Sequence, residues 1–121
     1  MADTIYFEGR EIPSYGEPVS EDGLKENSIY YIINFIDEEM IVPTMKTVVF
    51  VGKNLEQDDI NSFCFQDIDS YNGGIRYDLE NMDNYGDFFV CSTKELNGVY
   101  NFEHALERLM HCFLRQKQKK A

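Results

Sequence analysis

The chain lacks tryptophan, and it has only three prolines among its 121 residues. It also lacks any apolar run approaching the ~18 to 20 residues that a membrane-spanning helix needs. We therefore expect no membrane span. The segment Met1 to Thr4 has neither the basic region nor the apolar stretch of a secretory signal, which predicts a cytoplasmic location.

Several chemistries are missing from the sequence. The three cysteines, Cys64, Cys91 and Cys112, are widely spaced, form no C-x-x-C pair and have no histidine at zinc-ligand spacing. We expect them to be reduced, buried thiols. The chain also lacks a glycine-rich phosphate loop and a G-x-S-x-G nucleophile elbow. No cofactor is expected.

Basic residues are few, and they are unevenly placed. The chain has 22 acidic and 11 basic side chains, so its formal net charge is −11. All the acids lie in residues 1–107, whereas residues 108–121 carry five basic side chains and no acid. An acidic body repels nucleic acid and attracts basic proteins. The basic end suits the C-terminus of a helix, where it complements the helix dipole.

Strand-forming segments dominate the middle of the chain. They cover residues 28–36, 40–42 and 46–51 around Pro43, 61–66 and 86–91, with shorter candidates at 4–7 and 75–77. Residues 67–70 read as an acidic turn, and no repeat or linker divides the chain. We expect one domain over residues 1–121. Because strands and helices do not alternate, we predict an α+β fold: an antiparallel twisted sheet of about five to six strands with one packed C-terminal amphipathic helix.

The C-terminal helix is predicted from Asn101, a suitable N-cap, with Glu103 in its first turn. Its apolar residues recur at intervals of three and four and form one broad face, which we expect to pack on the sheet. These residues are Phe102, Ala105, Leu106, Leu109, Met110, Cys112 and Phe113. The opposite face holds His104, Arg108, His111 and Arg115, with the histidines expected in solvent.

Successive residues of a strand point to opposite faces of the sheet, and segment 29–36 is apolar on both faces. Both faces of the sheet therefore need to be covered. One helix covers one face. The other face requires the proline-containing segment 9–23 wrapped across it, strong curvature of the sheet, or a second protomer. The pattern favours a homodimer.

Two candidate metal motifs do not fit their templates. The stretch that begins at Asp67 departs from a calcium-binding EF-hand loop at Tyr71, Asn72 and Asp78. His104 and His111 lie two helical turns apart, about 10.5 Å, which is too far to share one ion. No metal site is assigned. A small carboxylate-based or divalent-cation-dependent enzyme of unknown substrate, built around Asp67, Asp69 and Asp78, remains the alternative function.

Acidic and aromatic side chains are mixed in several short stretches, a combination that suits protein recognition. The candidate partner-binding residues are Asp37, Glu38, Glu39, Asp67, Asp69, Tyr71, Tyr77, Asp78 and Glu80. The sequence therefore predicts a small acidic protein-binding module that masks a basic protein partner, with the physical character of an inhibitor or immunity protein. No nucleic acid or membrane is expected as a partner.

Overall fold

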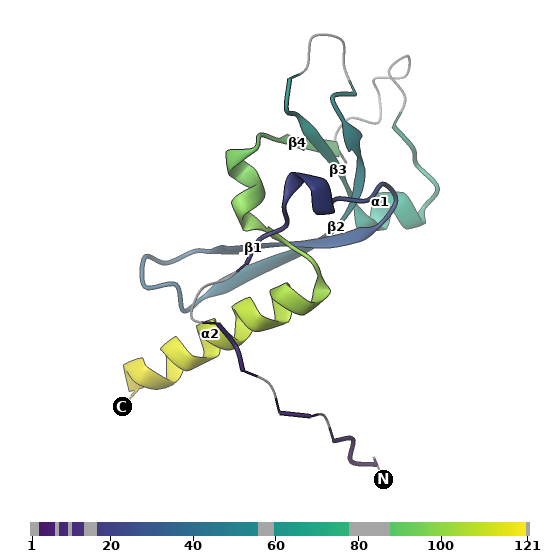
Figure 1. Cartoon of the computed structure of the whole chain (residues 1–121). Coiled ribbons are helices and arrows are strands. Elements are labelled where there is room, and N and C mark those ends of the chain that lie inside the picture. The colour runs from purple at the N-terminus through teal and green to yellow at the C-terminus, as the bar shows by residue number, and fades with distance from the viewer. Residues whose placement is uncertain are drawn as a thin grey trace.

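A computed structural model describes residues 3–6, 8–9, 11–13, 17–55, 60–77 and 88–120 of the chain (Figure 1). Its elements are η1 (Glu21–Gly23), β1 (Ile29–Phe35), β2 (Pro43–Lys53), β3 (Phe63–Asp67), α1 (Ile68–Asn72), β4 (Phe88–Cys91), η3 (Lys94–Gly98), β5 (Val99–Tyr100) and α2 (Phe102–Lys120). None of the helices in these ranges is both long enough and apolar enough to cross a membrane.

The five strands form one open sheet in the order β4-β3-β2-β1-β5, and every neighbouring pair is antiparallel. This confirms the predicted α+β fold with an antiparallel sheet and a C-terminal helix. Pro43 does not interrupt a strand, as the sequence suggested, but begins β2 opposite Phe35. A first strand position suits proline, because the ladder does not need its missing N–H there. The ladder between β2 and β3 is irregular between Phe50 and Gly52.

The main core lies on one face of this sheet. Its buried members are Tyr30, Val48, Phe50, Phe63, Phe65, Cys91, Leu96 and Val99. Leu96 belongs to η3, which covers this face, and Val19 and Leu24 of the N-terminal segment pack against it. The Tyr30 hydroxyl fixes that segment by accepting from Lys25 N at 2.8 Å and donating to Gly23 O at 3.2 Å.

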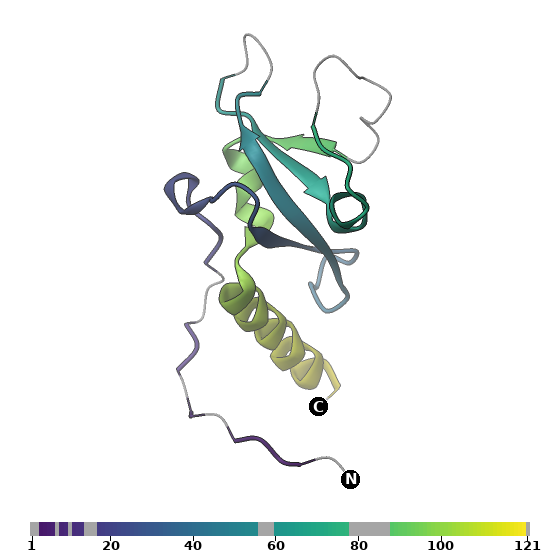
Figure 2. The ribbon, with the colours of Figure 1, turned by 90° about the vertical axis from the view of Figure 1, so that its right-hand side faces the viewer.

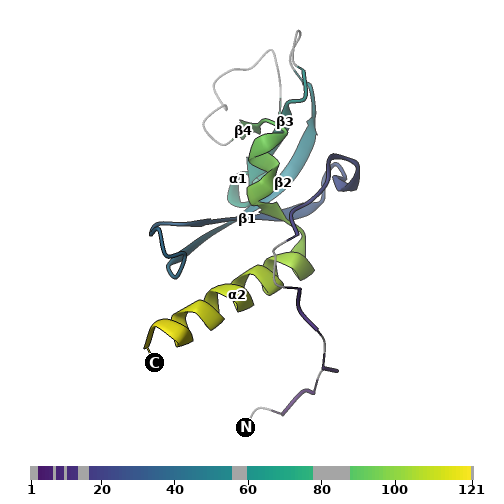
Figure 3. The ribbon, with the colours of Figure 1, turned by 60° about the vertical axis from the view of Figure 1, so that its left-hand side comes forward.

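A second, smaller core lies on the other face of β1. Ile33, Tyr100 and Ala105 are buried there, with Tyr31, Phe35 and Leu109 packed around them. Figure 3 shows α2 running along this side of the β1–β2 hairpin. Both faces of β1 are therefore covered within one chain, partly by residues 17–24. The homodimer that the sequence favoured stays a prediction.

Over β2 and β3 this second face packs against α1, whereas Ile29 and Met45 on the same face are 50% and 54% exposed. The sheet between β2 and β3 has α1 on one side and η3 on the other (Figure 2). Gln66 is fully buried beneath α1, and its Nε2 donates to Ser70 Oγ and to Ile75 O, each at 2.7 Å. The sequence missed α1, η3 and the two-residue β5. Residues 4–6 and 75–77 are not strands, and Phe7 lies outside the described residues.

Helix α2 begins as predicted, because Asn101 Oδ1 accepts a hydrogen bond from His104 N at 2.8 Å. Its rotation about its own axis differs from the prediction. Ala105, Leu109 and Cys112 face inward, but so do several of the polar residues expected in solvent. His104 lies 3.6 Å from the Glu17 carboxylate, and His111 Nε2 donates to the carbonyl of Pro13. The histidines therefore contact the N-terminal segment.

Candidate functional site

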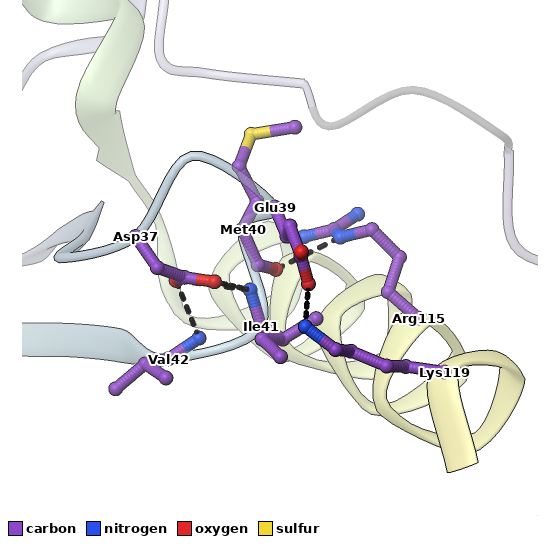
Figure 4. Close-up of polar contacts among 7 residues, drawn as sticks. All are labelled: Asp37, Glu39, Met40, Ile41, Val42, Arg115 and Lys119. Atoms are coloured by element: carbon purple, nitrogen blue, oxygen red, sulfur yellow. Dashed lines mark hydrogen bonds and ion pairs between the residues drawn. The ribbon is translucent and has the colours of Figure 1, made fainter.

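The acidic turn of the β1–β2 hairpin is a closed loop, called here the hairpin tip (residues 36–42). Asp37 organises it from within: its carboxylate accepts from Val42 N at 2.9 Å and from Ile41 N at 3.2 Å (Figure 4). Met40 takes a positive φ of 57°, which turns the chain. Desolvation acts to raise the pKa of Asp37, but the N–H groups of Val42 and Ile41 and the charge of Lys119 together lower it.

The C-terminal half of α2 holds this tip in place. Arg115 Nε donates to Met40 O at 2.8 Å, and Gln116 Nε2 donates to Ile41 O at 2.7 Å. Lys119 forms an ion pair with Glu39 (Figure 4). The basic end of the chain therefore lies against the acidic turn of the same molecule.

Phe35 lies at the centre of this contact. The guanidinium carbons of Arg108 and Arg115 lie 5.1 Å and 5.3 Å from the centroid of its ring. Both distances are within the range of a cation–π interaction. Arg108 Nε and Arg115 Nη2 are buried and have no hydrogen-bond partner within the described ranges, whereas Arg108 Nη2 lies 3.9 Å from Met40 Sδ.

The second predicted acidic stretch surrounds α1. Asp67 is the N-cap of this helix, and its carboxylate accepts from Asp69 N at 3.1 Å. The guanidinium of Arg76 lies 3.9 Å from the Tyr71 ring centroid and also donates to Tyr71 O at 2.8 Å. Tyr77 packs edge-on against Phe88 at 5.5 Å. Both tyrosines therefore have contacts within the chain.

The nine predicted partner-binding residues do not form one surface. Asp37, Glu38 and Glu39 lie at the hairpin tip, whereas the group from Asp67 to Tyr77 surrounds α1. Asp67 is opposite Val48, five residues along β2 from Pro43, so about 17 Å of strand separates the two groups. Figure 1 shows the tip and α1 at opposite ends of the β1–β2 hairpin. Asp78 and Glu80 lie outside the described residues.

The alternative function requires carboxylates to converge. No group of three His, Cys, Asp or Glu side chains within the described ranges is placed to hold a metal ion. Asp67 already caps a helix, and Asp78, the third residue of the hypothesis, lies outside those ranges. The carboxylate-enzyme hypothesis stays a prediction.

A further group of acids, called here the η1 acids, lies on the N-terminal segment: Glu17, Glu21, Asp22 and Glu26 are all exposed. Ser20 caps η1 by accepting from Gly23 N at 3.1 Å, and Thr93 Oγ1 donates to Glu21 at 2.7 Å. A hollow of about 400 Å³ lies beside these residues, lined in part by Glu17, Tyr30 and His104. The sequence indicates one helical turn at residues 20–24, which η1 confirms, but it gave these acids no functional role.

All three cysteines are buried, and none of them forms a disulfide bond within the described part of the chain. Burial raises the pKa of Cys91 to about 11, and the nearby negative charge of Glu95 adds to the effect. A thiol with such a pKa is protonated at neutral pH and is a poor nucleophile. Cys91 is therefore a structural residue.

The outward side of α2 is the feature that sequence reasoning most clearly missed. Five large apolar side chains, called here the α2 stripe, are between 45% and 71% exposed. They are Phe102, Leu106, Met110, Phe113 and Leu114. Beside the stripe is a hollow of about 180 Å³, lined by Tyr31, Met45, Phe102, Ala105, Leu106 and Leu109. A signal was present: the apolar face spans about 200° of the helix, more than one contact with a sheet covers.

No protein-family model, curated protein or solved structure matches this chain at a significant level.

Proposed function

We propose that this protein binds a basic protein partner through its acidic surface. The observation that carries the proposal is the position of the basic residues of α2. Arg108, Arg115 and Lys119 all contact the hairpin or its tip. These three positive charges balance the three negative charges of the tip, on Asp37, Glu38 and Glu39. The remaining residues therefore carry the whole net charge of −11.

The η1 acids are the best-defined acidic surface for this role. They project from a segment that is itself fixed, because Val19 N donates to Val99 O at 2.8 Å and Tyr30 holds the following turn. A fixed segment presents its charges in one arrangement, which favours one orientation of a partner. The neighbouring hollow is lined by the carboxylate of Glu17 and also by Lys25, so its lining carries charges of both signs.

The partner that suits this surface is a protein with a basic cleft or patch. An acidic surface raises the association rate with such a partner and repels nucleic acid. Inhibitors and immunity proteins that mask basic enzymes work under the same physical requirement. The proposed function is therefore inhibition by occupation of a basic surface.

The test begins with immobilised protein exposed to extract of the source cell at low salt and at ~0.5 M salt, where the Debye length is much shorter. We expect a basic protein to be retained at low salt and released at high salt. The purified partner is then titrated against two variants that each remove three negative charges. One is Glu21→Gln/Asp22→Asn/Glu26→Gln.

The matched control is Asp3→Asn/Glu8→Gln/Glu11→Gln, which changes the net charge equally at other exposed positions. We expect the η1 variant to weaken binding at least tenfold more than the control. Equal weakening by both variants would show that only net charge matters and would remove the η1 acids from the proposal. If no basic protein is retained at either salt concentration, the proposed function is wrong.

A further inference from the structure

The α2 stripe exposes more apolar surface than a solvated helix face requires. Its five side chains expose on the order of 500 Å² together, taking ~150 to 250 Å² for each large side chain when fully accessible. Contiguous apolar patches of this size commonly mark an interaction site. The adjoining apolar hollow extends the patch from the helix onto Tyr31 and Met45 of the sheet.

The residues along this surface are arranged symmetrically about Met110. Leu106 and Leu114 lie four residues before and after it, and Glu103 and Lys117 lie seven residues before and after it. At about 100° per residue, all five fall within about 80° of one another on the outward side of α2. The order along the helix is therefore acid, leucine, methionine, leucine, base.

Such an order is complementary to itself when read in the opposite direction. Two copies of α2 placed antiparallel, with a two-fold axis at Met110, bring Leu106 of each chain against the partner's Leu114. The same operation places Glu103, about 10.5 Å from the axis, beside the partner's Lys117. A two-fold interface uses the same patch on both chains, so it needs this kind of self-complementarity.

We propose that a second copy of this chain covers the α2 stripe, forming a homodimer through an antiparallel pair of α2 helices. The apolar side chains of the stripe form the centre of the interface, and Glu103 and Lys117 form its rim. This surface is distinct from the η1 acids, so the proposal does not depend on the proposed function. It also differs from the sheet-mediated homodimer that the sequence suggested.

Charge complementarity favours a second copy over an unrelated occupant. The helix carries Glu103 near its start, and its described exposed bases, Lys117 and Lys119, lie near its end. Antiparallel pairing therefore places the base of one chain near the acid of the other, and it also aligns the helix dipoles favourably. The net charge of −11 on each chain opposes association, but at ~0.15 M salt this repulsion is screened beyond about 8 Å.

The size of the stripe sets the strength of the dimer. About 500 Å² from each chain gives a total near the lower limit of about 1,000 Å² for a specific interface. The association is therefore weak, and the dimer dissociates on dilution. Sedimentation velocity on the full chain, from low micromolar to millimolar concentration at physiological salt, is expected to show a reversible change from monomer to dimer.

Met110→Glu tests the two-fold axis, because it places two like charges against each other at the centre of the interface. We expect this variant to stay monomeric over the whole concentration range. The control is Ile60→Glu, which adds the same charge at an exposed residue away from α2 and should dimerise like the parent. Circular dichroism of both variants establishes that the fold is kept.

The antiparallel arrangement is tested by exchanging the rim charges. Glu103→Lys alone and Lys117→Glu alone should each raise the dissociation constant several-fold, because each replaces both exposed rim pairs of the dimer with like charges. The double variant should restore dimerisation. A parent chain that is monomeric at millimolar concentration, or a Met110→Glu variant that still dimerises, would overturn the proposal. Failure of the double variant to restore the dimer would refute the antiparallel register.

Discussion

Replacing Phe35 with leucine tests which side of α2 faces the sheet. The guanidinium carbons of Arg108 and Arg115 lie 5.1 Å and 5.3 Å from the centroid of the Phe35 ring. Leucine keeps an apolar side chain at this half-buried position but removes the aromatic face that both cations contact. We expect Phe35→Leu to lower the free energy of unfolding substantially.

The magnitude follows from the two cation–π contacts. A cation–π contact contributes about 0.5 to 1 kcal/mol when exposed and about 2 kcal/mol when desolvated. Two half-buried contacts therefore contribute about 2 kcal/mol, and the smaller apolar volume of leucine adds to the loss. Phe113→Leu makes the same chemical change on the outward side, where Lys117 lies 5.0 Å from the ring. That variant should lose no more than about 1 kcal/mol, because its single cation is exposed.

The measurement is urea unfolding of both variants and the parent chain, at a concentration low enough to keep the chain monomeric. A double-mutant cycle of Phe35→Leu with Arg115→Met isolates the cation–π energy, which we expect to be about 0.5 to 1.5 kcal/mol. If Phe113→Leu is the more destabilising of the two, the apolar side of the helix faces inward. A coupling energy near zero would show that the contact contributes nothing.

Two further predictions concern pH. Because the pKa of Asp37 is lowered in the folded chain, its stabilising effect is present above the ordinary value of 3.8 and is lost as the pH falls through the folded-state value. Asp37→Asn should therefore reduce the acid-induced loss of stability in unfolding curves taken between pH 5 and pH 2, and an unchanged pH dependence would contradict this assignment. The pKa of Cys91 is raised from 9.0 to about 11, so the folded chain should lose stability as the pH rises from about 9 to 11. In Cys91→Ala this alkaline loss should be smaller, and if it stays the same another group is responsible.

Much of the fold was predictable because the strand segments carry strong local signals. The apolar β-prone run from residue 29 and the acidic turn that follows it define the β1–β2 hairpin. Asn101 marks the start of α2 through its capping hydrogen bond. The short elements were not predictable: β5 has two residues, and α1 depends on the burial of Gln66, which sequence periodicity does not reveal.

The rotation of α2 was predicted wrongly for a physical reason. The sequence presented a wide apolar face and a basic face, and burial of the apolar face was the expected outcome. Which side of α2 faces inward depends instead on the groups that the sheet and the hairpin tip present to the helix. Phe35 and the carbonyl groups of the hairpin tip provide partners for Arg115 and Gln116, so a mixed side of the helix faces inward.

The candidate site was predicted less well than the fold. Local mixing of acids with aromatics pointed to residues 37–39. It could not show that Lys119 pairs with Glu39, or that the N–H group of Val42 donates to Asp37, within the same chain. Contacts across 80 residues of sequence leave no local pattern. The η1 acids were overlooked because the segment that carries them has little regular structure. Its sequence gave no sign that hydrogen bonds to Val99 and Tyr30 hold it in place.

The strand order also has a consequence for how the chain folds as it is made. Strand β1 is the first in the chain, but one of its two neighbours is β5, which begins 64 residues after β1 ends. At a synthesis rate of about 5 to 20 residues per second, roughly 3 to 13 s pass before that neighbour is made. During this interval one edge of β1 and its Tyr31, Ile33 and Phe35 face have no cover from β5 or α2. A nascent chain in this state presents an unpaired apolar strand, so its yield in the cell should depend on how quickly translation proceeds past residue 99.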